Sequence, residues 1–275
     1  MMTLRKFQTA AALLTVSLMG SAWAATTAPE PSTEEFVPTV GQSGKDVIWV
    51  PTPQSLVDKM LDMAGLTAED KLVDLGSGDG RTVITAAKRG AMARGIEYNP
   101  DMVALSRSAA RREGVSDRAV FEQADIFESD FSEATVVTLF LLPNLNLRLK
   151  PILLDMAPGT RVVSNSFTMG DWDPDETGEA EGCSSYCIAY KWVVPAKVEG
   201  SWKLPDGELQ LTQKYQKVEG SLLRGSEKVA ITDGRLEGAN IRFKVGDDEY
   251  TAKVTGKQMQ GKINGQGEWS ASQVG

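Results

Sequence analysis

The sequence predicts an α/β domain with a doubly wound, mainly parallel sheet over residues 46–195, followed by a small antiparallel all-β module over residues 196–275. Between residues 46 and 195, short apolar runs alternate with amphipathic helical patterns, which is typical of strands covered by helices. From residue 196, short alternating runs are separated by glycine turns, which indicates antiparallel strands. A chain of 275 residues can give both regions their own buried core.

The amino terminus has the pattern of an export signal. Arg5 and Lys6 precede an apolar run over 7–19, and Ala22-Trp23-Ala24 provides a cleavage site after Ala24. A retained anchor is the alternative, but the run is shorter than the roughly 20 residues that cross a bilayer. We therefore expect an exported protein, periplasmic or secreted, with no transmembrane segment after cleavage. Residues 25–45, rich in Pro, Thr and Glu, are expected to be a flexible lead-in.

The first helix is expected over Gln54 to Ala64, where apolar residues recur at helical spacing. It follows Pro51-Thr52-Pro53, which is interpreted either as a rigid helix start or as a strap over a ligand.

A glycine-rich turn follows the first strand, which runs through Leu72, Val73 and Leu75, and leads into a helix from Thr82 to Arg89. Glycines at 76, 78 and 80 let the backbone approach a nucleotide-like ligand closely. Their spacing differs from the dinucleotide fingerprint, and no Lys-Ser/Thr pair forms a P-loop. NAD, FAD and ATP are therefore disfavoured.

The next two strands each end in an acidic residue. The strand over 93–98 contains Glu97, which is placed to accept hydrogen bonds from both hydroxyls of an adenosine ribose. A helix capped by 99–101 leads to the strand over 119–125, whose Asp125 is placed to bind the adenine amino group. Ile126 or Phe127 would pack on the ring.

The fourth strand, 135–142, is almost wholly apolar and is expected to be central in the sheet. Residues 143–146 lie at its carboxyl end, where open α/β sheets bind ligands. A helix over 147–156, broken by Pro151, precedes a fifth strand over 160–167.

An acidic stretch and two cysteines follow the fifth strand. Residues 169–181 are interpreted as a solvated connector or as a collar that attracts a basic substrate. Cys183 and Cys187 are either a disulfide or two free thiols, and both interpretations stay open.

Composition excludes several function classes. The net charge is −8 and the pI near 4.8, so no nucleic-acid partner is expected. The chain has no histidine, which removes Ser-His-Asp and Cys-His nucleophiles and histidine-ligated zinc, and two cysteines cannot supply four ligands. No metal is expected.

The carboxyl-terminal module is predicted to be a barrel or sandwich of similar hairpins, because the pentapeptide at 197–201 recurs at 217–221. This module would either dock a substrate or cover an edge of the α/β sheet.

The motifs of the α/β region resemble those of the class I, seven-strand S-adenosylmethionine-dependent methyltransferases, whose sheet is Rossmann-like. The resemblance covers residues 46–195. More narrowly, the segments 50–53, 74–81, 95–98 and 139–146 resemble the protein lysine methyltransferases related to the mitochondrial enzyme that modifies the c-subunit of ATP synthase.

This resemblance implies a cofactor, S-adenosylmethionine, and a set of residues that hold it. The glycines would let the backbone approach the methionine part of the cofactor, and Asp74 would hold its amino group. Glu97 would bind the ribose and Asp125 the adenine. The implied cofactor-binding residues are Pro51, Thr52, Asp74, Gly76, Ser77, Gly78, Gly80, Glu97, Asp125 and Ile126.

The resemblance also bears on the acceptor. The segment 142–145, Leu-Pro-Asn-Leu, lacks the Asn/Asp-Pro-Pro-aromatic motif of enzymes that methylate adenine or glutamine, so these acceptors are disfavoured. Methyl transfer needs an in-line nucleophile about 3 Å from the methyl carbon, and a base is optional. Asn144, Asn146 and Tyr98 are the candidates for orienting the acceptor.

The leading hypothesis is thus a methyltransferase acting on an acceptor amine, with a protein lysine as the candidate. Two alternatives remain. One is an exported, non-catalytic nucleoside-binding protein on a methyltransferase fold, and the other is a small-molecule methyltransferase.

Overall fold

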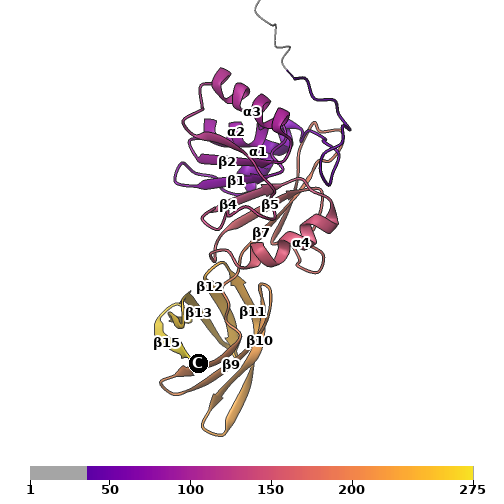
Figure 1. Ribbon diagram of the computed structural model, residues 1–275. Helices are drawn as coiled ribbons and strands as arrows, with labels where there is room; N and C mark the ends of the chain where they lie inside the picture. Colours follow the sequence, from indigo (N-terminus) through magenta and orange to yellow (C-terminus); the bar gives the residue numbers. More distant parts are fainter. Residues whose placement is uncertain (1–35, 275) are drawn as a thin grey trace, which may run out of the picture. The chain divides into compact units, whose positions relative to one another are not determined.

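The computed structural model describes residues 36–274, so the predicted export signal and residues 25–35 of the lead-in lie outside the described residues. The α/β region forms a seven-stranded sheet with the order β3-β2-β1-β4-β5-β7-β6 (Figure 1). Strands β1 to β5 are parallel, and β7 is antiparallel to both β5 and β6. The predicted doubly wound, mainly parallel sheet is confirmed.

From α1 to β3 helices and strands alternate along the chain as predicted, whereas β3 leads to β4, and β5 to β6 and β7, with no helix between them. The strands are β1 (Lys71–Leu75), β2 (Met92–Glu97), β3 (Ala119–Gln123), β4 (Val136–Leu139), β5 (Arg161–Asn165), β6 (Glu176–Glu179) and β7 (Ile188–Val193). The helices are α1 (Gln54–Met63), α2 (Arg81–Lys88), α3 (Pro100–Arg112) and α4 (Pro143–Leu154).

Each central strand contributes to two apolar cores, one on either face of the sheet. Because successive side chains of a strand point to opposite faces, Leu72 packs with helices α1 to α3 whereas Val73 packs with α4. Val136 and Val137 of β4 divide in the same way. Burial on both faces explains why β4 is apolar except for Thr138.

Helix α4 differs from its prediction at its start and in its interior. It begins at Pro143, so the segment 143–146 is its first turn, and Pro151 lies inside the helix without breaking it. Proline is well suited to the first helical position because its missing N–H has no partner there anyway. Leu145, Leu149 and Leu153 form the buried stripe that holds α4 on the sheet.

The lead-in also ends earlier than predicted. Within residues 41–49 the chain folds back on itself, since the Gly41 N–H donates to the Trp49 carbonyl at 2.8 Å and the Trp49 N–H to the Gln42 carbonyl at 2.9 Å. This hairpin packs on the α/β domain, so residues 41–45 belong to that domain.

The carboxyl-terminal module is a closed barrel of eight antiparallel strands, which decides between the two predicted forms (Figure 1). Large side chains fill its interior, among them Trp202, Phe243 and Tyr250. The strands are β8 (Gly200–Leu204), β9 (Gly207–Lys214), β10 (Lys217–Arg224), β11 (Glu227–Glu237), β12 (Asn240–Val245), β13 (Asp248–Thr255), β14 (Gln258–Ile263) and β15 (Gly267–Gln273).

The acidic stretch is more than a solvated connector. Asp173 pairs with Lys217 at 2.6 Å and Asp175 with Arg235 at 2.6 Å, both cations belonging to the barrel. Trp172 is fully buried, and the stretch also contributes strand β6. Asp173 and Asp175 are therefore engaged in contacts within the chain, which the sequence could not show because Lys217 and Arg235 lie more than 40 residues away.

Within residues 36–274, none of the helices combines the length and apolar content that crossing a bilayer requires.

Candidate active site

A cavity of about 550 Å³ opens where strands β1 to β4 end. This is the edge at which open parallel sheets bind their ligands. Nine of the ten predicted cofactor-binding residues line it: Pro51, Thr52, Asp74, Gly76, Ser77, Gly78, Glu97, Asp125 and Ile126.

The glycine turn forms the floor of the cavity with two of its three glycines. Gly76 and Gly78 have φ of 76° and 53°, in the left-handed region that favours glycine. A Cβ on Gly78 would come within 2.7 Å of the Trp49 ring nitrogen, so the hairpin can cover the turn only because this residue has no side chain.

Gly80 has a different role from the one predicted. It does not line the cavity, and a Cβ there would lie 2.7 Å from the Phe121 ring and 2.8 Å from the Ser106 hydroxyl. The third glycine therefore allows close packing between the start of α2 and the neighbouring strand and helix, outside the cavity.

Glu97 is held rigidly at the end of β2. One carboxylate oxygen accepts from the Gly78 N–H at 2.9 Å, and the other accepts from the Asn99 N–H at 2.9 Å. Each oxygen retains a further lone pair toward the cavity. The pair of oxygens is thereby pre-positioned to accept two hydroxyl groups.

Asp74 is a buried carboxyl group that lacks a cationic partner among the described residues. It is 7% exposed and accepts a hydrogen bond from the Thr138 hydroxyl at 2.7 Å. Burial raises the pKa of Asp74 to about 7, against the opposing effect of that bond and with a further contribution from the nearby carboxylates of Asp79 and Glu97. A ligand cation placed here would relieve this penalty.

Asp125, which follows β3, also lines the cavity, and it pairs with Lys45 of the hairpin. This ion pair lowers the pKa of Asp125, as does the hydrogen bond from the Phe127 N–H at 2.9 Å. Lys45 also lies 4.7 Å from the centre of the Tyr98 ring, a cation–π contact.

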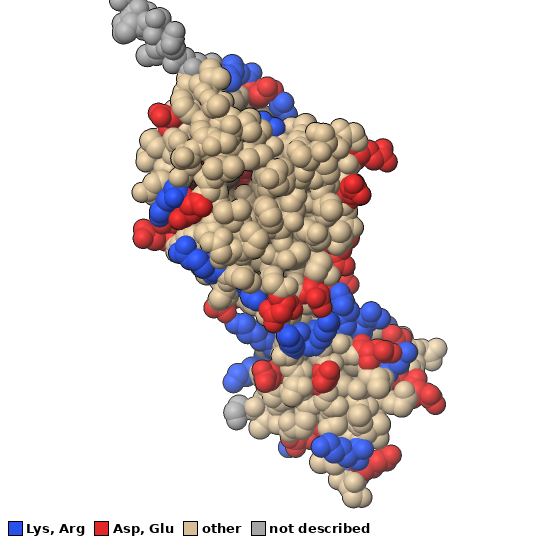
Figure 2. Space-filling view, turned by 90° about the vertical axis from the view of Figure 1, so that its right-hand side faces the viewer, with Lys and Arg blue, Asp and Glu red and all other residues tan. Residues whose placement is uncertain are grey.

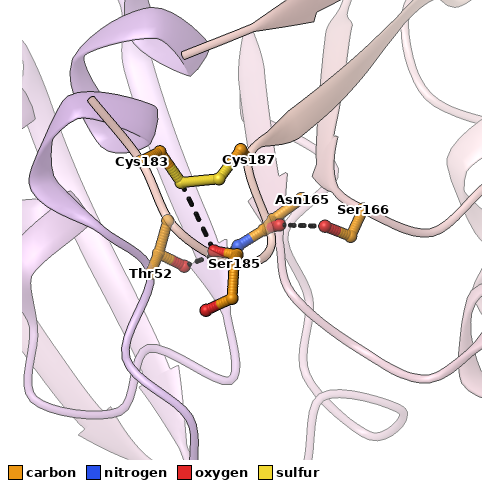
Figure 3. The surroundings of a disulfide bond; sticks show 6 residues. All are labelled: Thr52, Asn165, Ser166, Cys183, Ser185 and Cys187. Atoms are coloured by element: carbon orange, nitrogen blue, oxygen red, sulfur yellow. Dashed lines mark hydrogen bonds between the residues drawn. A yellow bond between two sulfur atoms is a disulfide. The ribbon is translucent and has the colours of Figure 1, made fainter. Parts of the chain in front are cut away.

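The Pro51-Thr52-Pro53 segment begins the first helix, since Pro53 precedes α1 as its N-cap, and its Pro51 and Thr52 also line the cavity. It is fixed from two sides. Arg81 donates to the Thr52 carbonyl at 2.8 Å, and the Asn165 amide donates to the Thr52 hydroxyl at 3.1 Å (Figure 3).

The three residues predicted to orient an acceptor lie in different places. Tyr98 lines the cavity beside Lys45. Asn144 is exposed on α4 outside the cavity, and Asn146 is fully buried behind it, where its amide donates to the Phe167 carbonyl at 3.3 Å. Asn144 and Asn146 are therefore corrected from acceptor-orienting residues to helix residues, and Asn146 supports the backbone after β5.

Three aromatic residues that the sequence pattern did not indicate also line the cavity: Phe140 after β4, Phe167 after β5 and Tyr186 before β7. The signal for the first two was present, since each is an aromatic residue at the carboxyl end of a strand. Tyr186 lies between Cys183 and Cys187, which form a disulfide with Cα atoms 5.6 Å apart (Figure 3). Its position depends on a strand that the sequence analysis did not predict.

Taken together, a cavity at the ends of parallel strands, a rigid acceptor pair for ribose hydroxyls and a buried carboxyl group suited to a cation define an S-adenosylmethionine-dependent methyltransferase. Residues 74–176 match the family described as the ANTKMT methyltransferase domain.

The relatives agree with this class. The chain is 42% identical over 151 residues to a protein-lysine N-methyltransferase of Saccharolobus islandicus, covering 54% of this chain and 94% of that relative, so it belongs to this methyltransferase family. It is also 44% identical over 110 residues to the human lysine N-methyltransferase named for the c-subunit of ATP synthase, covering 39% of this chain. The chain spans about half, 47%, of that enzyme.

A solved structure shows the same fold with a ligand. The structure titled RNA methyltransferase from Salinibacter ruber in complex with S-adenosyl-L-homocysteine shares 50% sequence identity and a TM-score of 0.51, covering 54% of this chain and 96% of that chain. The part of this chain that this match does not cover is long enough to include the barrel.

The residues present fit S-adenosylmethionine. Asp74 would meet the cationic amino group, which explains how the fold tolerates a buried carboxyl group there, and Glu97 would accept the ribose hydroxyls. When bound, the cofactor supplies an electrophilic methyl group on a sulfonium. The protein contributes position and exclusion of water, which account for much of the acceleration of such a transfer.

Proposed function

We infer that this methyltransferase acts on the side-chain amine of a protein lysine. The observation that carries the proposal is the division of the cavity: the acidic side chains of the α/β sheet that line it lie at the ends of β1 to β3, whereas the residues after β4 and β5 are apolar or aromatic. A slender aliphatic chain ending in one amine suits the second part. The names of the relatives from Saccharolobus islandicus and human support the same acceptor.

The reaction needs no group that the cavity lacks. A lysine is protonated in water because its ordinary pKa is near 10.4. Entry into an apolar passage lowers this pKa, so the ammonium first gives a proton to water. The neutral nitrogen then forms a bond to the methyl carbon while the carbon–sulfur bond breaks. That electron pair stays on sulfur, which leaves S-adenosylhomocysteine and a methylammonium.

An RNA acceptor is the competing possibility, since the Salinibacter ruber structure carries that title. Two observations favour a protein acceptor instead. The chain has a net charge of −8, which repels a backbone of phosphates. On the face in Figure 2, most lysine and arginine side chains gather in one band that Asp and Glu side chains border, and a wide area beyond the band carries no charge to bind phosphates.

The experiment is a labelling assay preceded by a binding assay. Calorimetric titration with S-adenosylhomocysteine establishes the cofactor site, and labelled S-adenosylmethionine is then supplied with protein and RNA fractions of the source cell. Label on a protein band that acid hydrolysis releases as methyl-lysine supports the proposal. Label confined to RNA or to small molecules contradicts it.

We further propose that the enzyme acts outside the cytoplasm. The support is the amino-terminal signal pattern ending at Ala24, together with the Cys183–Cys187 disulfide, a bond typical of oxidising compartments. Such an enzyme requires cofactor delivered from the cytoplasm. Cell fractionation with sequencing of the mature amino terminus tests this: a chain beginning at Ala25 in the exported fraction is expected, and an intact Met1 in the cytoplasm contradicts it.

A further inference from the structure

Three aromatic rings meet at the end of the cavity opposite Glu97 and Asp125. Phe140 and Tyr186 lie 5.1 Å apart between ring centres and nearly edge to face, at 62°. Phe167 lies 6.1 Å from Phe140 and 6.5 Å from Tyr186. All three line the cavity, and Tyr186 is 44% exposed, so a ligand can reach this ring cluster from solvent.

The charged groups of the cavity lie elsewhere. Among the described residues that line it, Asp74, Asp79, Arg81, Glu97 and Asp125 lie in or after β1, β2 and β3, and Lys45 and Asp46 belong to the hairpin. Those contributed from β4 onward are uncharged. A cation at the ring cluster would therefore face π-electron surfaces without a competing salt bridge, an arrangement that recognises ammonium groups.

We propose that Phe140, Phe167 and Tyr186 form the subsite for the acceptor nitrogen, and that the Cys183–Cys187 disulfide positions Tyr186 in it. This inference rests on the proposed lysine acceptor. The lysine nitrogen is neutral when it attacks and positive once the new bond to carbon has formed. Ring faces around it consequently stabilise the transition state more than the bound amine, which is the condition for accelerating the step.

The backbone around two of the rings is held in an unusual conformation. Tyr186 has φ of 55° and Ser166, next to Phe167, has φ of 60°, both in the left-handed region that non-glycine residues rarely adopt. The Ser166 N–H donates to the Ile188 carbonyl at 2.7 Å, which joins the two segments. Such conformations persist only where the surroundings impose them, and at Tyr186 the surrounding constraint is the short disulfide-closed loop.

The test is a titration of the full chain, saturated with S-adenosylhomocysteine, with Nα-acetyl-Nε-trimethyl-lysine amide and with its uncharged isostere, in which carbon replaces the side-chain nitrogen. We expect the charged probe to bind at least about fivefold more tightly than the isostere. Equal affinities would overturn the subsite.

Variants of the ring residues and of the disulfide test which side chains bind the charged probe. Tyr186→Leu and Phe140→Leu should each weaken the charged probe about fivefold, whereas Tyr186→Phe keeps the ring and the affinity. Ser184→Ala, an exposed change in the same loop, is the matched control. The double variant Cys183→Ser/Cys187→Ser should behave like Tyr186→Leu, and unchanged probe affinity in either would overturn the inference.

The titration with S-adenosylhomocysteine separates two kinds of failure. Every variant is expected to keep the affinity of the parent protein for it, which also shows that the variant is folded. Failure of the parent protein itself to bind would overturn the proposed function and the subsite with it, whereas normal binding without recognition of the charged probe would overturn the subsite alone.

Discussion

The two ends of the cavity are built on different principles. At the end formed by β1 to β3, acidic side chains are fixed by backbone N–H groups, as Glu97 is by those of Gly78 and Asn99. At the end formed after β4, β5 and before β7, rings pack on one another and carry no charge. The comparison indicates that the first end recognises one fixed molecule through hydrogen bonds, while the second accommodates a group whose charge changes during the reaction.

The largest effect is expected from removing the carboxylate at the acidic end. Glu97→Ala should weaken S-adenosylhomocysteine binding about a hundredfold, because two hydrogen bonds to a charged acceptor are lost. Calorimetry measures this, with Glu122→Ala, an exposed glutamate on the adjacent strand, as the control. Affinity within a few-fold of the parent protein would show that Glu97 does not hold the ribose.

In the glycine turn, Gly80 supports the packing of the fold, whereas Gly76 and Gly78 line the cavity. Gly80→Ala should lower the free energy of unfolding by about 2–4 kcal/mol, since it adds a side chain at φ of 80° and overlaps Phe121 and Ser106. Gly65→Ala is the control with a similar φ of 59° and open space around it, so denaturant unfolding of both isolates the packing contribution. A Gly80 variant as stable as the Gly65 variant would refute the packing role.

The pKa of Asp74, raised to about 7, predicts how cofactor binding varies with pH. The cationic amino group needs the ionised carboxylate, so affinity should fall as the pH is lowered below 7, approaching about tenfold per pH unit. Asp74→Asn should bind more weakly and abolish this slope. Calorimetry between pH 5 and 8, in buffers of different ionisation enthalpy, measures the slope and the proton released; a pH-independent affinity would count against the contact.

The same carboxyl group affects the stability of the free protein with the opposite sign. A pKa raised on folding contributes stability that is present below the ordinary value near 3.8 and is lost as the pH rises through 7. The stability difference between the parent protein and Asp74→Asn should therefore shift against the parent protein between pH 5 and 8. Thermal unfolding of both without ligand checks the direction.

The smallest effect is expected at the hairpin. Lys45→Ala frees Asp125 for the adenine amino group but removes only a partly exposed ion pair, so S-adenosylhomocysteine should bind up to about threefold more tightly. Lys88→Ala removes an exposed pair remote from the cavity and serves as the control. A large loss of affinity would mean that Lys45 itself contacts the cofactor.

The acidic end could be predicted from the sequence because each of its parts lies within a few residues of a strand end. Gly76, Gly78 and Glu97 need only a strand, a turn and a second strand for their geometry to follow. The role of Gly80 could not be predicted in this way, because its neighbour Phe121 lies 41 residues further along the chain and comes close only through sheet pairing.

The aromatic end and the acidic stretch depend on contacts that no local pattern reveals. Phe140 and Tyr186 meet because β7 turns back antiparallel beside β5, and the sequence pattern does not predict that strand. The local pattern around Asp173 and Asp175 indicates contact with solvent or substrate. Their partners, Lys217 and Arg235, belong to the barrel, so no pattern near the two carboxylates reveals these ion pairs. Side-chain chemistry is visible in the sequence in both cases, but the partner is not.

The disulfide also has a chemical consequence for an enzyme that handles a reactive methyl donor. A thiolate is a stronger nucleophile than a lysine amine, and the chain's two cysteines lie within three residues of a ring that lines the cavity. Bonded to each other, both sulfur atoms lack the free electron-rich thiolate that could intercept the methyl group. The cross-link thus leaves neither cysteine beside this ring as a nucleophile that could compete with the acceptor.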